Sequence, residues 1–349
     1  MLDDINVLKQ RDPKGALGVA ATEYQQAVFD ATIINPEHDE REITNIIVTG
    51  MGGSVLAALL VKVWLRDVLP VPFEVVRGYT LPSYVGHNTL VVVSSCSGNT
   101  EETLSALDQA QACGAQIAIT SSGGKLLQRA QESETAHIVL PDRNKIEPRM
   151  TTIAQVRALV ALLAHFNLIS SDYYDEVAAQ SALLQEQSSE WLPDVTTDRN
   201  YAKQLALLAV GKTPVFYGGL LTAPLAYKWK ISWNENAKNV AVWNELPEFN
   251  HNEFIGWSSH PVDKPFAVFD LKSSFEHPRI LKRFEITDRL LSGKRPKAVP
   301  VELQGETVLA QLLWGCILAD FVSIYVAILN GVDPTPVDLV ESFKAEMAK

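Results

Sequence analysis

The sequence predicts an α/β protein built from two units, each a mostly parallel sheet flanked by helices. Short apolar runs alternate with amphipathic segments, which is the pattern of parallel strands joined by covering helices. The stretches 136–168 and 298–331 share one order, a strand, a polar loop and a long apolar helix, and this indicates an internal duplication. With 349 residues, 47% of them apolar, the chain is long enough to bury the cores of both units.

The first unit is expected to follow an N-terminal helical segment at residues 1–45. Residues 16–32 have the apolar spacing of a helix, and a polar loop at 36–41 follows them. From residue 46 the pattern alternates, with strands expected at 46–49, 73–77, 89–94, 116–120 and 137–140 and helices at 54–64, 100–113 and 125–132. We expect this first domain to span residues 46–185.

The second unit is expected after the polar stretch 185–198 and should span residues 198–349. Near its start, the segment Gly211-Lys212-Thr213 looks like the end of a Walker A loop. Ala206 stands where such a loop needs glycine, so we expect only a turn before a strand. The last helix of this unit is predicted at 337–347.

The apolar stretch 308–332 has nearly the length of a membrane span. Gln311 and Asp320 interrupt it and no basic residues flank it, which favours a buried helix. This stretch and the apolar helix at 153–168 can each belong to the protein core or to an interface between subunits. We expect the core, where most apolar residues lie.

Charge and composition exclude several classes of function. Lys and Arg number 30 against 41 Asp and Glu, which gives a net charge of −11. A chain this acidic is a poor binder of nucleic acid or of an anionic membrane surface, so we expect neither as a partner. An anionic substrate would need donors that are gathered locally.

Cysteine usage and the first residues favour the cytoplasm. Cys96, Cys113 and Cys316 are far apart in sequence and form no CxxC pair, which suits a reducing compartment and excludes a zinc ribbon. The start of the chain, Met1-Leu2-Asp3-Asp4, lacks the basic and apolar regions of a signal peptide. The seven histidines show no HxH or HxxxH spacing, so we expect no metal.

The string Gly50-Met51-Gly52-Gly53-Ser54 lies between a predicted strand and a predicted helix. Glycines there let backbone N–H groups approach an anion, and the helix start adds partial positive charge. A dinucleotide site is excluded because Val55 replaces the last glycine of that fingerprint and Arg77 replaces its acidic residue. The alternative is a tight turn without a ligand.

Two further loops rich in serine and glycine also follow strands and open helices, at 94–103 and at 120–125. Because the carboxyl ends of parallel strands lie at one edge of a sheet, the three loops predict a single phosphate pocket. The alternative for the loop at 94–103 is an ordinary helix N-cap with Glu in the first turn, and we expect one hydroxyl to serve in that way.

These loops, with three further segments, resemble the bifunctional phosphoglucose/phosphomannose isomerase family, from about Ile46 to the C-terminus. The segments are Gly50–Ser54, Ser95–Thr103, Glu147-Pro148-Arg149, Asn234–Lys238 and Phe249–Glu253. The resemblance implies two sugar isomerase (SIS) domains of α/β sandwich type and a homodimer. Cys96 departs from the family loop, which usually has Tyr there, and this concerns fine specificity more than the phosphate site.

The resemblance also implies roles in substrate binding. Ser54, Ser95, Ser97 and Thr100 would hold the phosphate, and Gly52 and Gly53 would let the sugar lie close to the backbone. Arg149 matches the family arginine beside C1 and C2, where a fixed cation stabilises an enediolate. Without the resemblance, Arg149 would be read as one partner of a surface salt bridge.

Three more residues match the family's proton-transfer groups. Glu235 matches the general base between C2 and C1, and His251, supplied by the neighbouring subunit, matches the group that assists ring opening. Lys344 aligns with a lysine that helps this histidine. Taken alone, Glu235 would be read as part of a solvated helix start and His251 as a loop hydrogen-bonder.

We therefore expect an isomerase that acts on a sugar phosphate without metal or redox cofactor. It would interconvert glucose 6-phosphate and fructose 6-phosphate, and also mannose 6-phosphate and fructose 6-phosphate. The alternative is a non-catalytic SIS protein that binds a sugar phosphate. Such proteins commonly carry a DNA-binding helix-turn-helix, and the residues before the first strand are too few and too acidic for one.

Overall fold

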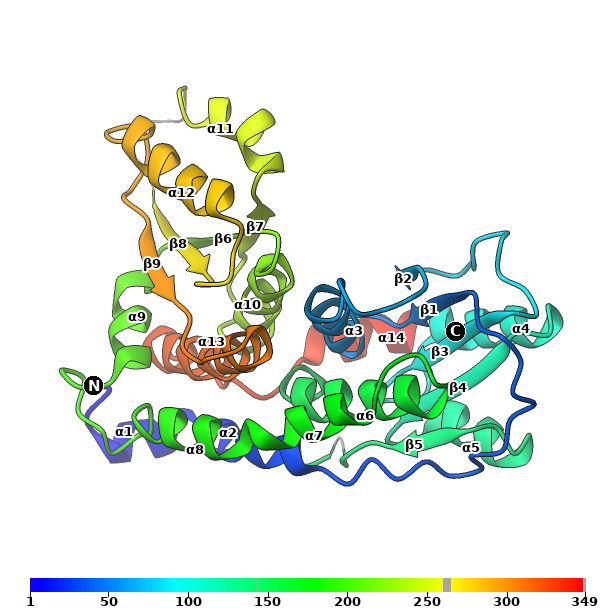
Figure 1. Cartoon of the computed structure of the whole chain (residues 1–349). Helices are drawn as coiled ribbons and strands as arrows, with labels where there is room; N and C mark the ends of the chain where they lie inside the picture. The colour runs from blue at the N-terminus through cyan, green and yellow to red at the C-terminus, as the bar shows by residue number, and fades with distance from the viewer. Residues whose placement is uncertain (143, 260–264, 348–349) are drawn as a thin grey trace. The chain divides into compact units, whose positions relative to one another are not determined.

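The computed structural model describes residues 1–142, 144–259 and 265–347, and it divides into two compact units (Figure 1). The first-sheet unit consists of Thr22–Gln185 and Glu306–Leu313. The second-sheet unit consists of Met1–Ala21, Glu186–Gly305 and Trp314–Lys349. The start of the chain therefore belongs to the unit that holds the second sheet.

The first-sheet unit contains five parallel strands in the order β2-β1-β3-β4-β5. Their bounds are β1 (Asn45–Thr49), β2 (Phe73–Val76), β3 (Thr89–Ser94), β4 (Gln116–Ser121) and β5 (His137–Val139). Helices α3 (Gly53–Trp64), α4 (Glu101–Ala112) and α5 (Gly124–Glu132) follow strands, and η2 (Pro148–Met150), α6 (Thr152–His165), α7 (Asp172–Ala179) and α8 (Ser181–Ser189) come after the sheet. The expected strands and helices of this unit are confirmed.

Both faces of the first sheet are covered, and alternation along its strands shows how. Ile47, Val91 and Val93 share a core cluster with Leu107 of α4 and Leu126 of α5. Since successive strand residues point to opposite faces, Ile46 and Val48 of β1 and Leu90 and Val92 of β3, which are also buried, face away from this cluster. On that side α3 and α6 pack against each other and against the strands. All six residues of β3 are buried, as expected for a central parallel strand.

The second-sheet unit contains four parallel strands in the order β7-β6-β8-β9 (Figure 1). Their bounds are β6 (Thr213–Gly218), β7 (Val242–Glu245), β8 (Phe266–Lys272) and β9 (Val299–Glu302). The helices are α1 (Ile5–Arg11), α2 (Ala16–Ala20), α9 (Tyr201–Ala209), α10 (Ala223–Asn236), η3 (Glu248–His251), α11 (Glu253–Gly256), α12 (Pro278–Leu290), α13 (Val308–Asn330), which starts in the first-sheet unit, and α14 (Asp338–Met347). Thr213 opens β6, which confirms the turn before a strand at Gly211-Lys212-Thr213.

Aromatic residues form the core between the second sheet and α10. Phe216 of β6 lies 5.4 Å from Trp229 and 5.2 Å from Trp233 of α10, between ring centroids. Helix α13 is long and apolar enough to span a membrane, but 94% of its most apolar window is buried inside the protein. The expectation of a buried helix is confirmed.

The single helix expected at 16–32 is wrong. The structure has α2 and, after a break, the 3-10 helix η1 (Glu23–Val28). Gln26 of η1 donates to the carbonyl of Met150 at 2.7 Å and accepts from the N–H of Ala154 at 3.1 Å. These tertiary hydrogen bonds hold η1 in the first-sheet unit, while α2 belongs to the other unit. Local apolar spacing carries no information about this division.

Candidate functional site

The three predicted loops lie together at the carboxyl ends of β1, β3 and β4. Ser54 Oγ accepts a hydrogen bond from the N–H of Cys96 at 3.1 Å, which joins the first loop to the second. The Ser121 hydroxyl donates to the carbonyl of Ser95 at 2.7 Å and joins the third. The sequence prediction that these loops form one site is consistent with this geometry.

Three hydroxyls form a triangle at the start of α4. Ser95 Oγ lies 3.3 Å from Ser97 Oγ and 3.0 Å from Thr100 Oγ1, and the third side, from Ser97 Oγ to Thr100 Oγ1, measures 3.4 Å. Hydroxyls this close can all donate to one small anion. A tetrahedral oxyanion with several acceptor oxygens suits such a cluster.

Thr100 occupies the N-cap position of α4 but does not cap it. Its side chain accepts no hydrogen bond from the first turn, and the hydroxyl is turned toward Ser95 and Ser97 instead. The expectation that one hydroxyl of this loop acts as an ordinary cap is wrong for Thr100. Because a helix start leaves N–H groups without intrahelical partners, the first turn of α4 can add donors and partial positive charge to the site.

Close packing of backbones explains two glycines of the site. A Cβ on Gly98, whose φ is +67°, would lie 1.8 Å from the carbonyl oxygen of Gly123 in the third loop. A Cβ on Gly53 would lie 3.0 Å from backbone atoms of Pro148 and Arg149. Glycine is therefore needed for the loops to approach one another and for the first loop to approach η2.

Arg149 is buried beside these loops, with 1% of its surface exposed. Its guanidinium lies 3.5 Å from the carboxylate of Glu147, from Nη1 to Oε2. The alternative interpretation of Arg149, as one partner of a surface salt bridge, is correct that an ion pair exists. It is wrong about the location, because the arginine is buried inside the protein. A buried guanidinium has few rotamers open to it and acts as a fixed cation.

The side chain of Cys96 points into the protein. Its Sγ lies 3.6 Å from Thr151 Oγ1, which in turn accepts from Gln155 Nε2 at 2.7 Å. The cysteine is 3% exposed. Cys96 therefore packs beneath the segment that carries Arg149 and leaves the hydroxyl triangle to Ser95, Ser97 and Thr100.

The residues expected to transfer protons belong to the second-sheet unit. Glu235 lies in the last turn of α10 and is partly buried, so the interpretation as a solvated helix start is wrong about its position. The next residue, Asn236, is fully buried and donates to Ser323 Oγ of α13 at 2.9 Å. The backbone at Glu235 is thus held by the buried hydrogen bond of its neighbour Asn236.

His251 ends η3 and is exposed. Within the described part of the chain its ring makes no hydrogen bond, so the interpretation as a loop hydrogen-bonder finds no support. Lys344 is on exposed α14 and forms an ion pair with Glu341 at 2.7 Å. In the same described ranges, no hydrogen bond joins Lys344 to His251.

Glu253, two residues after His251, is not among the site residues that the sequence predicts. Its carboxylate accepts hydrogen bonds from the Tyr217 hydroxyl of β6 and from Asn244 Nδ2 of β7, the latter at 2.7 Å. Burial, and then the charge of Glu253, raises the pKa of Tyr217, which keeps the hydroxyl protonated as a donor. Strand alternation, which places Tyr217 on the same face of β6 as Val215 in one buried cluster, is the signal that could have suggested a buried partner for its hydroxyl.

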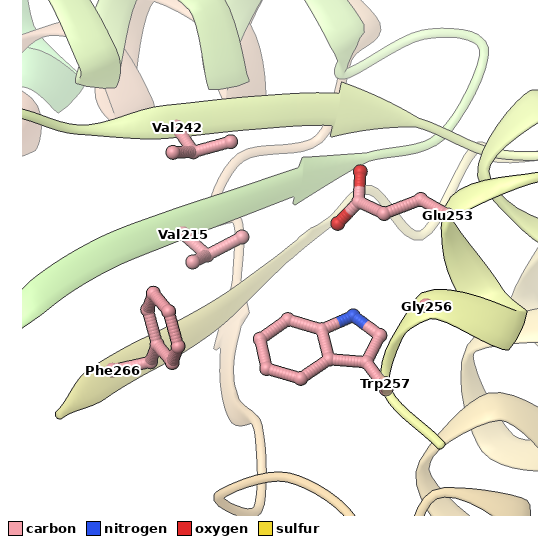
Figure 2. A pocket seen from close by; sticks show the side chains of 6 residues that line it. All are labelled: Val215, Val242, Glu253, Gly256, Trp257 and Phe266. Atoms are coloured by element: carbon pink, nitrogen blue, oxygen red, sulfur yellow. The ribbon is translucent and has the colours of Figure 1, made fainter. Parts of the chain in front are cut away.

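Glu253 also lines a cavity of about 290 Å³ (Figure 2). The other lining residues are apolar or glycine: Val215, Val242, Gly256, Trp257 and Phe266. Figure 2 shows the carboxylate of Glu253 directed from α11 toward the strands that carry Val215 and Val242. The cavity lies in the second-sheet unit, whereas the hydroxyl triangle belongs to the first-sheet unit.

No group of three or more His, Cys, Asp or Glu side chains is arranged to hold a metal ion among the residues that the structure describes. The donors gathered at the triangle are neutral hydroxyls, which suit an anion better than a cation.

Comparison with known proteins decides the family. The model of the bacterial phospho-glucose isomerase C-terminal SIS domain matches residues 198–347, and the SIS domain model matches residues 41–165. A bifunctional phosphoglucose/phosphomannose isomerase of Caldicellulosiruptor bescii is 34% identical over 310 residues, which is 88% of this chain and 91% of the relative. The chain belongs to the bifunctional phosphoglucose/phosphomannose isomerase family. The family's enzyme of Aquifex aeolicus is also 34% identical, over 87% of this chain and 90% of its own length.

Solved structures confirm the SIS-type fold. The crystal structure of a glucose-6-phosphate isomerase like protein from Thermus thermophilus superposes with a TM-score of 0.66 at 18% identity, covering 99% of this chain and 98% of that one. The resemblance found in the sequence, to the bifunctional phosphoglucose/phosphomannose isomerase family with two SIS domains, is confirmed.

Proposed function

We propose that the protein is an isomerase that interconverts glucose 6-phosphate and fructose 6-phosphate, and also mannose 6-phosphate and fructose 6-phosphate. The observation that carries the proposal is the triangle of Ser95, Ser97 and Thr100 hydroxyls at the uncapped start of α4. Membership of the family supports it, because the relatives in Caldicellulosiruptor bescii and Aquifex aeolicus are named bifunctional phosphoglucose/phosphomannose isomerases.

The substrate phosphate binds at the triangle in this proposal. Ser54 anchors the neighbouring loop through the N–H of Cys96. Gly52, where a Cβ would have no atom within 4 Å, leaves room for the sugar beside the backbone, whereas Gly53 lets the loop pack against Pro148 and Arg149. The first-turn N–H groups of α4 face the same anion. The chain as a whole has a net charge of −11 and offers the phosphate no general electrostatic attraction. Neutral hydroxyl donors suffice at this site because the start of α4 supplies partial positive charge.

The reaction has two stages. In ring opening, a proton leaves the C1 hydroxyl of the sugar and another is delivered to the ring oxygen as the bond from C1 to that oxygen breaks. His251 assists this step, and Lys344 helps the histidine. In the second stage Glu235 takes the proton from C2 and returns it to C1, while the hydroxyl proton of O2 moves to O1. Arg149 stabilises the negative charge of the enediolate between these steps. Proton transfers of this kind need no metal or redox cofactor.

We further propose a homodimer in which His251 serves the active site of the neighbouring subunit. The exposure of His251 supports this, because an exposed, unbonded side chain is available to a second chain. We also propose a cytoplasmic location, in keeping with three free cysteines and with substrates of glycolysis and gluconeogenesis.

The first experiment is product formation from fructose 6-phosphate by purified, metal-free protein, with glucose 6-phosphate and mannose 6-phosphate measured separately. Both products are expected. Glucose 6-phosphate alone would restrict the enzyme to one epimer. If folded protein binds fructose 6-phosphate but forms neither product, the protein is instead a sugar-phosphate-binding SIS protein.

The assigned base is tested by Glu235→Gln. The amide cannot accept the C2 proton, so we expect kcat to fall by about 10²–10⁴ while the Kd for fructose 6-phosphate changes little. Glu285→Gln makes the same chemical change in an exposed pair with Lys282 and should keep full activity. A fully active Glu235→Gln variant would refute the role of Glu235.

A further inference from the structure

The segment that carries His251 is attached to α12 just before the histidine. Asn250 Nδ2 donates to Thr287 Oγ1 at 2.9 Å, and Asn250 Oδ1 accepts from Arg283 Nη1 at 3.1 Å. Both partners lie on α12. The amide of Asn250 is thereby bonded at both ends, which fixes its orientation.

The same segment is attached to the sheet just after the histidine. Glu253 receives one hydrogen bond from Tyr217 of β6 and one from Asn244 of β7. Trp257, four residues further, donates from Nε1 to the Tyr217 hydroxyl at 3.2 Å. Figure 2 shows the Trp257 indole beside the Glu253 carboxylate. The carboxylate thus connects α11 to two neighbouring strands at once.

His251 differs from its neighbours in the chain because its own side chain is bonded to nothing in the described ranges. Phe249, two residues earlier, is fully buried against Tyr217, with ring centroids 4.5 Å apart. The backbone on both sides is therefore held while the imidazole is left exposed. A residue held in this way has little backbone freedom to lose when it meets a substrate.

We infer that Glu253 is a positioning residue for His251, holding the η3–α11 segment so that the imidazole is presented outward at a fixed place. This inference rests on the role of His251 given under the proposed function. Because the Glu253 carboxylate is bonded to Tyr217 and Asn244, we expect its effect on the reaction to pass through His251.

The hydrogen-bond pattern makes glutamine a poor substitute for Glu253. Both carboxylate oxygens accept, one from Tyr217 and one from Asn244. A glutamine accepts only on its oxygen, so when that oxygen accepts from Asn244 its NH₂ group faces the Tyr217 hydroxyl, which must then accept and loses the acceptor of its own proton. Asn244 cannot turn its amide freely, because its Oδ1 accepts from the N–H of Glu245 at 2.8 Å. Glu253→Gln therefore loosens one strand contact while preserving size.

The test combines Glu253→Gln with His251→Ala in the full-length protein. We expect Glu253→Gln to lower kcat for glucose 6-phosphate about tenfold or more, with KM within about threefold of wild type. In the His251→Ala background the same change should cost less than about twofold, because the group it positions is gone. Glu285→Gln is the matched control and should be neutral in both backgrounds.

A second readout works even if His251→Ala is too slow to assay. With glucose 6-phosphate deuterated at C2, a variant that slows only ring opening makes proton transfer less rate-limiting, so its isotope effect on kcat/KM should fall toward one. A general distortion of the site would leave the isotope effect unchanged or raise it. Thermal unfolding of Glu253→Gln establishes that the variant is folded under the assay conditions.

The outcomes separate the inference from the function on which it rests. Wild-type protein without isomerase activity would overturn the proposed function, and a fully active His251→Ala would overturn the role of His251. If His251→Ala is impaired while Glu253→Gln is fully active, or if the two losses multiply and the isotope effect does not fall, the positioning role is refuted. Coupled losses with a reduced isotope effect establish it.

Discussion

At the scale of single residues, two threonines at the start of α4, one at the N-cap and one in the first turn, show how position decides the use of a hydroxyl. Thr100 Oγ1 lies with Ser95 and Ser97 at the helix start. Thr103, three residues on, is buried, and its Oγ1 has no hydrogen-bond partner among the described residues. The same side chain is a phosphate ligand in our proposal at one position and part of the core at the other.

These threonines give a matched pair of variants. Thr100→Val keeps the shape and removes one hydrogen bond to a charged phosphate, worth about 1.5–3 kcal/mol, so KM for fructose 6-phosphate should rise roughly ten- to a hundredfold. Thr103→Val should leave KM within about twofold and stability unchanged or slightly higher, because it removes an unpaired polar atom from the core. Steady-state kinetics compares them. Equal KM values would remove Thr100 from the phosphate site.

A buried carboxyl predicts a pH dependence of stability. Burial raises the pKa of Asp270 in β8 to about 7, against the attraction of Arg295 and Lys272 and with the repulsion of Asp288 and Glu302. Between about pH 4 and 7 the folded state therefore holds a proton that the unfolded state has lost. The contribution of Asp270 to the free energy of unfolding falls by about 1.4 kcal/mol per pH unit as pH rises through this window, and stays low above it.

Asp270→Asn removes this titration. Between pH 5 and pH 8 the wild type should lose the stability that depends on protonated Asp270, and the variant should not. The free energy of unfolding of the variant, measured by urea unfolding at each pH, should therefore rise relative to that of the wild type. Asp175→Asn makes the same change on the exposed surface of α7 and should show no such shift. A difference for Asp270→Asn that is constant with pH would contradict the raised pKa.

At the scale of elements, α10 and α13 are joined by a buried ion pair. Lys228 Nζ lies 2.7 and 2.6 Å from the two carboxylate oxygens of Asp320, and both residues are fully buried. Ser232 donates to Asp320 at 2.8 Å. Since α10 ends with Glu235 and Asn236, this network and the Asn236–Ser323 bond hold the proposed base in place.

Breaking the pair should be costly. Asp320→Asn leaves the Lys228 ammonium buried without its counter-ion, and we expect a loss of about 3–5 kcal/mol in the free energy of unfolding. The double variant Lys228→Met with Asp320→Leu removes both charges, so it should recover most of the free energy of unfolding that Asp320→Asn loses. Glu285→Gln, in an exposed pair, should cost under about 1 kcal/mol. Urea unfolding measures all three, and an Asp320→Asn cost as small as that of Glu285→Gln would contradict the argument.

At the scale of the whole molecule, our proposal makes each active site depend on a second chain. If His251 serves the neighbouring subunit, each active site takes Glu235 from one chain and His251 from the other. Glu235→Gln and His251→Ala then damage contributions that come from different chains. Mixing the two inactive homodimers under conditions of subunit exchange forms hybrids in which one site has both native residues.

Random exchange makes about half of the dimers hybrid, so activity should recover to roughly a quarter of wild type. Each variant exchanged with itself is the control and should stay inactive. Absence of recovery, with hybrids demonstrated by mass, would place Glu235 and His251 of one chain in the same site. A fully active monomer at high dilution would also refute the shared site.

The strands, the loops and the family were accessible from the sequence because their signals are local. Apolar runs of four to six residues locate β1, β3 and β6, and serine and glycine after those runs locate the phosphate loops. Propensity and spacing depend on near neighbours in the chain, so one sequence contains them.

Only the tertiary structure decided the environment of each functional group. The burial of Arg149 depends on the loop of Gly53, almost a hundred residues away, and the second phosphate loop is held by Ser54 and Ser121, which lie about 40 and 26 residues from the atoms they bond. Glu253 gains its role from Tyr217 and from the turn of the chain that brings β6 beside α11. Hydrogen bonds and burial between distant segments exist only after the chain has folded, and local sequence patterns do not contain them.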